Sequence, residues 1–249
     1  MKGAVVASVG TTHPWNIAGV GLDARVCARY GIRHTAAVAG VSAQDASGVH
    51  ALHAVPTPVL EAQLRALPPA SVYCIGALPD AAAVRAVAAF LAARSANAAV
   101  VDPVFTATLG GELADGAAID AFRSELIPLP IILLPNRSEA ERLLGRTIDF
   151  AGAPTAAQEL RARGPSAVLL KGGHFEGVLR DILVAGSTTF YEEARLGGSM
   201  RGSGGVLAAA LACELALGND LRAAVVAARA LVRERIAARI VFDGVQVAF

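Results

Sequence analysis

The chain has 249 residues, of which 54% are hydrophobic and 17% are charged, and its formal net charge is +1. This length is sufficient for one large domain with a well-buried core, and the low charge content excludes broad disorder. The 22 basic and 21 acidic residues nearly balance, so no basic field favours nucleic acid. No apolar run in the sequence approaches the roughly 18 residues that span a bilayer. We therefore expect neither a nucleic-acid nor a membrane partner.

Three cysteines, Cys27, Cys74 and Cys213, are widely spaced and set in apolar surroundings. Buried free thiols are the simplest interpretation of an odd number in such positions, and they favour a reducing compartment. Lys2, followed by a short apolar run, is more simply the start of a first strand than a signal peptide. The sequence therefore predicts a cytoplasmic protein.

Short apolar runs alternate with alanine- and leucine-rich stretches along the chain. The runs are typical of strands buried on both faces of a parallel sheet, and they cover residues 4–9, 71–76, 98–102, 131–135 and 167–171. The stretches between them predict helices near 18–30, 57–67, 79–95, 112–126 and 154–163. Strands that alternate with helices in this way indicate a mostly parallel, doubly wound sheet.

The last third of the chain differs from this alternation. Residues 182–194 predict a hairpin that turns at Gly186 and Ser187. Two long helices near 203–217 and 219–239 follow, with Gly218 and Asn219 as the break between them. No Gly/Ser- or Pro-rich linker divides the sequence, so we predict a single α/β domain over residues 1–249, with a Rossmann-like, mostly parallel central sheet and helices on both faces.

Polar clusters follow several of the predicted strands, and ligands of such sheets bind beyond the carboxyl ends of the strands. The clusters are Asp102-Pro103, Asn136 to Glu139, Lys171 to His174 and Gly202 to Gly205. Each alone has a simpler interpretation as a turn, a helix cap, a solvated loop or a tight connection. At successive ends of one sheet, however, they assemble what phosphoryl transfer requires.

The chemistry of phosphoryl transfer needs few parts. Main-chain N–H groups at a glycine-rich helix start can hold a phosphoryl group, because four amides there lack partners and the helix dipole favours an anion. A lysine such as Lys171 can neutralise nucleotide phosphate charge, and oxygens of the kind carried by Asp102 and Glu139 suit Mg²⁺ bound through water. The spacing matches neither a Walker A loop nor a protein-kinase set.

Six sequence blocks, in one order along nearly the whole chain, are similar to those of one enzyme family. They are "AGVGLDARVCARYGI" (18–32), "VSAQDASGV" (41–49), "VVDPV" (100–104), "LLPNRSEAERLLG" (133–145), "VLLKGGH" (168–174) and "RGSGGVLAAALA" (201–212). The last resembles the family's "HGTGCTLSAAIA". The family is the hydroxymethylpyrimidine/phosphomethylpyrimidine kinases of thiamine biosynthesis, within the ribokinase superfamily.

This resemblance implies a ribokinase-like sheet of about eight mainly parallel strands, often in a homodimer. It implies ATP and Mg²⁺ over the C-terminal half and a small heteroaromatic alcohol held by the N-terminal half. The expected acceptor-binding residues are Thr12, His13, Trp15, Asp23 and Gln44. The expected nucleotide-binding residues are Asp102, Asn136 and Lys171, with Glu139 and Asp102 holding Mg²⁺ through water. The transferring phosphoryl group is expected on Gly202, Ser203, Gly204 and Gly205.

Three departures from the family pattern fall in the chemistry. Gly205 stands where the family has a cysteine, and the wider superfamily an aspartate, that has been interpreted as the base. The loop "GTTHPWNIAG" (10–19) replaces a run of small residues, and His13 aligns roughly with the family's aspartate there. Thr108 lies near the position of a family lysine, which removes a positive charge from the nucleotide side.

The leading hypothesis is an ATP-dependent kinase of a hydroxymethyl heteroaromatic, with 4-amino-5-hydroxymethyl-2-methylpyrimidine and its phosphate as default acceptors in thiamine biosynthesis. One alternative is a paralogue for a pyridoxine-like or furan alcohol, which the altered 10–19 loop favours. The other is a catalytically silent ligand-binding or regulatory homologue, which Gly205 favours. Loss of the base is expected to lower the rate by about 10²–10⁴-fold unless another group, for example Asp23 or His13, accepts the proton.

Overall fold

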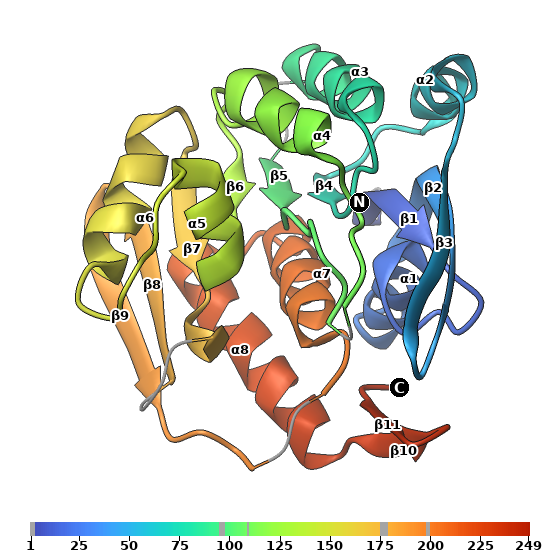
Figure 1. Cartoon of the computed structure of the whole chain (residues 1–249). Coiled ribbons are helices and arrows are strands. Elements are labelled where there is room, and N and C mark those ends of the chain that lie inside the picture. Colours follow the sequence, from blue (N-terminus) through green and yellow to red (C-terminus); the bar gives the residue numbers. More distant parts are fainter. Residues whose placement is uncertain (1–2, 95–97, 109, 175–178, 198–199) are drawn as a thin grey trace.

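The fold centres on one mixed sheet with helices on both faces (Figure 1). The computed structural model describes residues 3–94, 98–108, 110–174, 179–197 and 200–249. Within them, nine strands form the sheet in the order β3-β2-β1-β4-β5-β6-β7-β8-β9. Neighbouring strands are parallel from β2 to β7, whereas β3, β8 and β9 pair antiparallel to their neighbours. The predicted mostly parallel α/β sheet is confirmed.

The strands differ widely in length. In the large sheet they are β1 (Val5–Thr12), β2 (Arg33–Asp45), β3 (Gly48–Ala54), β4 (Val72–Ile75), β5 (Ala98–Val101), β6 (Ile132–Leu133), β7 (Ala167–Leu170), β8 (Leu179–Ala185) and β9 (Ser187–Glu193). A separate antiparallel hairpin near the C-terminus consists of β10 (Ile240–Phe242) and β11 (Val245–Val247).

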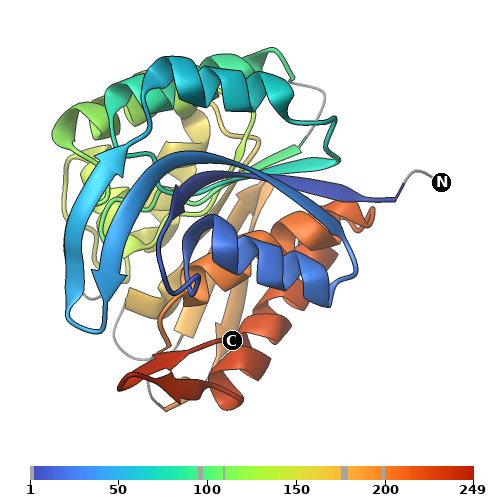
Figure 2. The same ribbon diagram turned by 90° about the vertical axis from the view of Figure 1, so that its right-hand side faces the viewer.

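The helices pack in two layers. They are α1 (Gly19–Arg29), α2 (Thr57–Ala66), α3 (Ala81–Ala92), α4 (Gly116–Ala121), α5 (Arg137–Leu144), α6 (Ala153–Ala162), α7 (Ser203–Ala216) and α8 (Leu221–Ala237). Figure 2 shows α1, α7 and α8 on one face of the sheet and the helices of the middle of the chain on the other. No described helix combines the length and the apolar character needed to cross a membrane.

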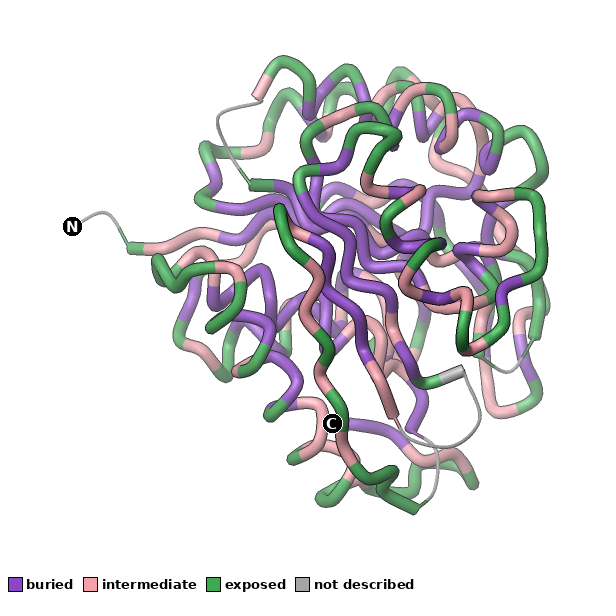
Figure 3. The backbone as a smooth tube through the Cα atoms, turned by 90° about the vertical axis from the view of Figure 1, so that its left-hand side faces the viewer, coloured by how far each residue is buried: buried purple, intermediate pink, exposed green. Residues whose placement is uncertain are grey.

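Two apolar cores form because successive strand residues point to opposite faces. On β4, Tyr73 and Ile75 pack in the core beneath α2 to α6, whereas Val72 and Cys74 pack against α1, α7 and α8. Figure 3 shows the central strands as a continuous buried band. Burial on both faces explains why these strands are uninterrupted apolar runs in the sequence.

Most predicted elements are present, and the differences have local causes. The hairpin at Gly186 and the helix break at Gly218 are confirmed, both glycines having positive φ. The helix predicted near 112–126 is present but starts later, since α4 begins only after Asp115, whose carboxylate caps the N–H of Ala118 at 2.6 Å. The hairpin of β2 and β3 was not predicted, because half-exposed side chains interrupt its apolar pattern.

The three cysteines are buried and free, as predicted. Cys27 on α1 and Cys213 on α7 lie with their Sγ atoms 3.6 Å apart in the core beneath those helices.

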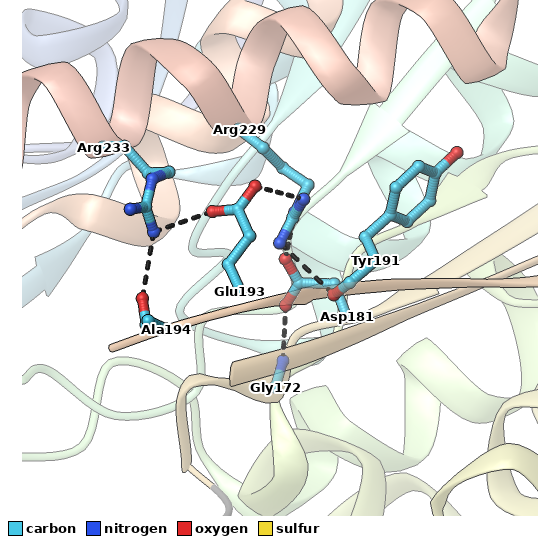
Figure 4. Close-up of polar contacts among 7 residues, drawn as sticks. All are labelled: Gly172, Asp181, Tyr191, Glu193, Ala194, Arg229 and Arg233. Atoms are coloured by element: carbon cyan, nitrogen blue, oxygen red, sulfur yellow. Dashed lines mark hydrogen bonds and ion pairs between the residues drawn. The ribbon is translucent and has the colours of Figure 1, made fainter. Parts of the chain in front are cut away.

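A buried ion-pair network ties α8 to the β8–β9 hairpin (Figure 4). Arg229 donates to Asp181 Oδ2 at 2.7 Å and to Glu193 Oε1 at 2.9 Å. Asp181 Oδ1 also accepts from the backbone N–H of Gly172 at 2.7 Å, and Arg233 contacts Glu193 Oε2 at 2.8 Å. The side chains of Arg229 and Asp181 are each only 8% exposed, so each charge depends on its partner for compensation.

We predict that Arg229→Ala destabilises the protein by about 3–5 kcal/mol, because Asp181 is then buried without its cation. Urea denaturation measures the change. Arg65→Ala is the matched control: it removes the exposed pair of Arg65 with Glu61 on α2 and should cost less than about 1 kcal/mol. Equal effects of the two substitutions would contradict a structural role for the network.

Candidate functional site

A cavity of about 470 Å³ opens at the carboxyl ends of the parallel strands. The chain order in the sheet reverses between β1 and β4, which is where open α/β sheets bind their ligands. Each of the parallel strands β1, β2, β4, β5, β6 and β7 places residues in the cavity wall at or just beyond its end; examples are Thr11, Gln44, Gly76, Asp102 and Lys171. The start of α7 closes the wall.

Nearly all the site residues expected from the sequence line this one cavity. They are His13, Asp23, Gln44, Asp102, Asn136, Glu139, Lys171, Gly202, Ser203, Gly204 and Gly205. Thr12 and Trp15 are not among its lining residues. Thr12 ends β1, where its backbone carbonyl accepts from Ser42 Oγ at 3.3 Å. Trp15 is half-buried and packs edge-on against Phe242 of β10, with ring centroids 5.0 Å apart.

Lys171 joins two carboxylates that come from two other strand ends. Its Nζ lies 2.5 Å from Asp102 Oδ1, beyond β5, and 3.4 Å from Glu139 Oε2, on α5 after β6. Glu139 is fixed by a capping box, in which Asn136 Oδ1 accepts from the N–H of Glu139 at 3.0 Å and Glu139 Oε2 accepts from that of Asn136 at 2.6 Å. Asn136 therefore serves as a helix cap and also orients the carboxylate.

Burial and mutual attraction set the charges of this cluster. Burial raises the pKa of Glu139 to about 7, although Lys171 opposes the shift. Burial by itself lowers the pKa of Lys171, but Asp102 and Glu139 outweigh it, so the pKa ends above its usual value. Lys171 is therefore a fixed positive charge at neutral pH, and Glu139 lies close to its titration point.

The two carboxylates fit a magnesium ion that arrives with a nucleotide. Mg²⁺ usually binds through one or two carboxylates together with substrate phosphates and several waters. Asp102 and Glu139 supply that number, and the described residues contain no group of three or more His, Cys, Asp or Glu side chains that could hold a metal without a substrate.

The N-terminus of α7 faces this cluster. Gly202 precedes the helix with φ +84°, and the first helical hydrogen bond runs from the N–H of Val206 to its carbonyl. A Cβ on Gly204 would lie 3.5 Å from both Asp102 Oδ2 and Lys171 Nζ. Backbone N–H groups at a helix start lack partners within the helix and favour an anion. The arrangement can hold a phosphoryl group between these amides and Lys171.

Gly205 and Asp23 lie on adjacent helices at the cavity. A Cβ on Gly205 would lie 3.0 Å from Leu22 Cδ2, so α1 packs closely against the start of α7. The next residue on α1, Asp23, also lines the cavity. Burial raises the pKa of Asp23 to about 7, and the nearby charge of Asp102 adds to the shift while the Ser8 hydroxyl opposes it. A carboxyl group whose pKa is raised to about 7 therefore lines the same cavity as the position that lacks a side chain.

Arg201 was missed by sequence reasoning, although it occupies the place of the histidine in the family's "HGTG". It is 4% exposed, lines the cavity and donates to Gln44 Oε1 at 2.6 Å. The C-terminal hairpin supports it, because the N–H of Arg201 bonds the carbonyl of Gln246 at 2.8 Å. Trp15 lies beside it, with its ring 6.0 Å from the Arg201 Cζ.

Sequence reasoning also missed Arg142 at the other side of the cavity. Arg142 lies three residues after Glu139 on α5, a spacing that places two residues on one helix face. It donates to Thr106 Oγ1 at 3.1 Å and pairs with Glu112 at 2.9 Å. Thr108 lines the same wall, so Arg142 brings a positive charge to the loop that lacks the family's lysine.

Comparison with known proteins places this geometry in one family. A family model described as phosphomethylpyrimidine kinase matches residues 15–247. The chain belongs to the phosphomethylpyrimidine kinase family. The resemblance found in the sequence blocks is thereby confirmed.

Individual relatives support this family assignment. A hydroxymethylpyrimidine/phosphomethylpyrimidine kinase of Synechococcus elongatus is 36% identical over 221 residues, which are 85% of this chain and 83% of that protein. A bifunctional thiamine-biosynthesis protein of Geobacter sulfurreducens is 34% identical over 92% of this chain. The chain spans only 48% of that protein and 43% of a bifunctional enzyme of Arabidopsis thaliana.

Solved structures share the fold. The phosphomethylpyrimidine kinase of Clostridium difficile superimposes with a TM-score of 0.83 at 26% identity, covering 94% of this chain and 99% of that one. An ADP complex of Bacillus subtilis pyridoxal kinase gives a TM-score of 0.91 at 22% identity, with 99% and 97% covered. The ribokinase-like fold expected from the resemblance is confirmed.

We predict that Gly202→Ala is much more harmful than Gly186→Ala, although both glycines have positive φ. At Gly186 a Cβ meets nothing within 4 Å, so the cost is the left-handed backbone alone, about 1–2 kcal/mol. At Gly202 a Cβ would overlap the carbonyl oxygen of Ile17, which adds about 1–3 kcal/mol of overpacking and displaces the first amides of α7. Urea denaturation and phosphate-transfer rates compare the two, and similar losses for both variants would contradict the close packing at Gly202.

Proposed function

We propose that the chain transfers a phosphoryl group from ATP to the hydroxymethyl group of a heteroaromatic alcohol. The default acceptors are 4-amino-5-hydroxymethyl-2-methylpyrimidine and its monophosphate. The observation that carries the proposal is the facing pair of phosphate-binding elements in one cavity, the start of α7 on one side and Lys171 with Asp102 and Glu139 on the other. Membership of the phosphomethylpyrimidine kinase family supports the choice of acceptor.

The proposed binding of the phosphate donor follows from the charges of Lys171, Asp102 and Glu139. The lysine ammonium offsets nucleotide phosphate charge, while Asp102 and Glu139 hold Mg²⁺, which neutralises phosphate oxygens as the bond to the leaving group breaks. Solved structures of pyridoxal kinases with ADP and with AMP-PCP, which share the fold, are consistent with ATP as donor.

The start of α7 stabilises the group in transit. Its N–H donors are fixed by the helix, so they need no rearrangement when charge develops on the phosphoryl oxygens. Gly204 allows the backbone to approach the cluster around Lys171 without a side chain between them, and Gly202 provides the positive φ from which the helix starts. Placement of donor and acceptor in one enclosed cavity then supplies the orientation that this reaction mostly depends on.

Asp23 is the proton acceptor in this proposal. The position of the family's cysteine is Gly205, and Asp23 lines the same cavity from the helix that packs against Gly205. A base is most effective when its pKa lies near the working pH, and burial places the pKa of Asp23 at about 7. His13 is a weaker candidate, because burial and the charge of Arg201 lower its pKa to about 4.

We infer a cytoplasmic location from the three buried free cysteines, which favour a reducing compartment. A homodimer remains a prediction from the family resemblance.

The proposal is tested by ³¹P NMR with purified protein, Mg·ATP and a panel of hydroxymethyl pyrimidines, pyridines and furans. Phosphate transfer to the pyrimidine alcohol or its monophosphate is expected. Transfer to a pyridine or furan alone would replace the default acceptor with another ring. Folded protein that binds ligand but transfers no phosphate to any alcohol would overturn the proposal and favour a silent ligand-binding homologue.

We predict that Asp23→Asn lowers kcat by about 10²–10⁴-fold, the usual contribution of a general base. In the unaltered protein, activity should rise with pH through about 7, because Asp23 must lose its proton to act and its pKa is raised to that value. The variant should lose the part of this rise that Asp23 contributes, whereas the part from Glu139, whose pKa is also raised to about 7, should remain. Gly205→Cys is the companion variant and should gain less than about tenfold if Asp23 already accepts the proton. A large gain from Gly205→Cys, with Asp23→Asn near full activity, would contradict the assignment.

A further inference from the structure

Arg201 is a buried cation in the cavity wall that faces no carboxylate. It is 4% exposed, and its guanidinium donates to the backbone carbonyl of Asp45 at 2.8 Å and to Gln44 Oε1 at 2.6 Å. Both acceptors are neutral groups. Arg201 takes part in none of the ion pairs among the described residues, which contrasts with Arg229 and its two carboxylates. A buried charge is costly unless an opposite charge compensates it.

The carboxylate whose charge acts on Arg201, that of Asp45, has other hydrogen-bond partners. It accepts from the N–H and the hydroxyl of Ser47 at 2.8 and 2.7 Å, and it pairs with His50 at 2.8 Å on an exposed turn. Burial therefore lowers the pKa of Arg201, and Asp45 opposes this only in part. A guanidinium nevertheless stays charged in proteins, so the wall carries a positive charge.

His13 supplies a second donor beside Arg201. Its Nε2 accepts from the N–H of Ala18 at 3.1 Å, which places the proton of the neutral ring on Nδ1. Nδ1 is buried and has no hydrogen-bond partner among the described residues, and His13 is 4% exposed and lines the same cavity. A buried donor without an acceptor costs free energy that a bound ligand can restore.

Gln44 completes this donor-rich wall. Its Oε1 is occupied by Arg201, and its Nε2 donates to Ser42 Oγ at 2.7 Å. The groups of Arg201, His13 and Gln44 that remain for a ligand are therefore N–H donors, one of them charged. A purely structural role for Arg201, as a link between β2 and the start of α7, does not require a full charge, because neutral donors also bond a carbonyl and an amide oxygen.

We infer that the acceptor carries an anionic oxygen on its ring, a carboxylate or an ionised hydroxyl, which Arg201 and His13 bind at the Gln44 end of the cavity. This inference rests on the proposed function for the reaction and for the ligand as a hydroxymethyl heteroaromatic, and it replaces the default pyrimidine, whose ring is neutral, with a ring that carries an anionic group. The phosphate groups have their own site between α7 and Lys171, whereas the Arg201 guanidinium is directed to β2 residues. The site therefore selects a charged ring over a neutral one.

The first test uses the unaltered protein and two ligands of matched shape, 5-hydroxymethylnicotinate and 5-hydroxymethylnicotinamide. Their affinities are measured by isothermal titration calorimetry at pH 7.5, with and without Mg·ADP. A charge-assisted hydrogen bond predicts that the carboxylate binds about 10- to 100-fold more tightly than the carboxamide. Equal affinities overturn the inference, and this comparison does not depend on the folding of any variant.

The second test assigns the preference to Arg201. Arg201→Gln keeps polar contacts but removes the charge, so the preference for the carboxylate should disappear. Arg201→Lys should keep part of it, because lysine retains the charge without the planar fork of donors. Arg239→Gln is the matched control: Arg239 bonds Gln246 Oε1 beside the same hairpin but does not line the cavity, and the preference should be unchanged.

The remaining outcomes separate the inference from the proposed function. If Arg201→Gln weakens only the pyrimidine monophosphate and leaves the carboxylate preference intact, Arg201 binds phosphate and the inference is wrong. If no alcohol is phosphorylated but the carboxylate preference follows Arg201, the inference stands while the proposed function fails. Phosphate transfer to the neutral pyrimidine, with no preference for the carboxylate, would support the proposed function and overturn the inference.

Discussion

The contact of Lys171 with Asp102 and Glu139 is the interaction on which the site depends. It joins the ends of three neighbouring strands, β5, β6 and β7, at the level where the start of α7 approaches. Without the lysine, two buried carboxylates would repel each other, and without the carboxylates the lysine would lose its charge to burial. The group that joins these strand ends is thus also the group that is proposed to bind phosphate.

The sequence predicts this half of the site well, for a physical reason. Strands buried on both faces are continuous apolar runs, so a polar residue directly after such a run marks a strand end. Asp102, Asn136 and Lys171 are all found in this way, and the sheet brings them together. The β2–β3 hairpin is less evident, because it lies at a sheet edge and alternates buried with exposed side chains.

The acceptor end could not be predicted in the same detail. Arg201 precedes a recognisable glycine loop, but its contacts with Gln44 and Asp45 join positions more than 150 residues apart in the sequence. Trp15 was expected to bind the acceptor, yet its ring packs against Phe242 from a hairpin that no pattern predicted. Side-chain direction at such long separations depends on tertiary packing, which local sequence does not encode.

The contact of Gly202 with the carbonyl of Ile17 has a thermodynamic consequence. The loop that carries His13 and the first turn of α7 touch backbone to backbone, with no room for even a methyl group between them. A ligand that shifts this loop is therefore expected to shift the amides that are proposed to hold the phosphoryl group, which couples the two halves of the cavity. Because such coupling is reciprocal, nucleotide would then alter the affinity for the acceptor by the same factor by which the acceptor alters that for nucleotide.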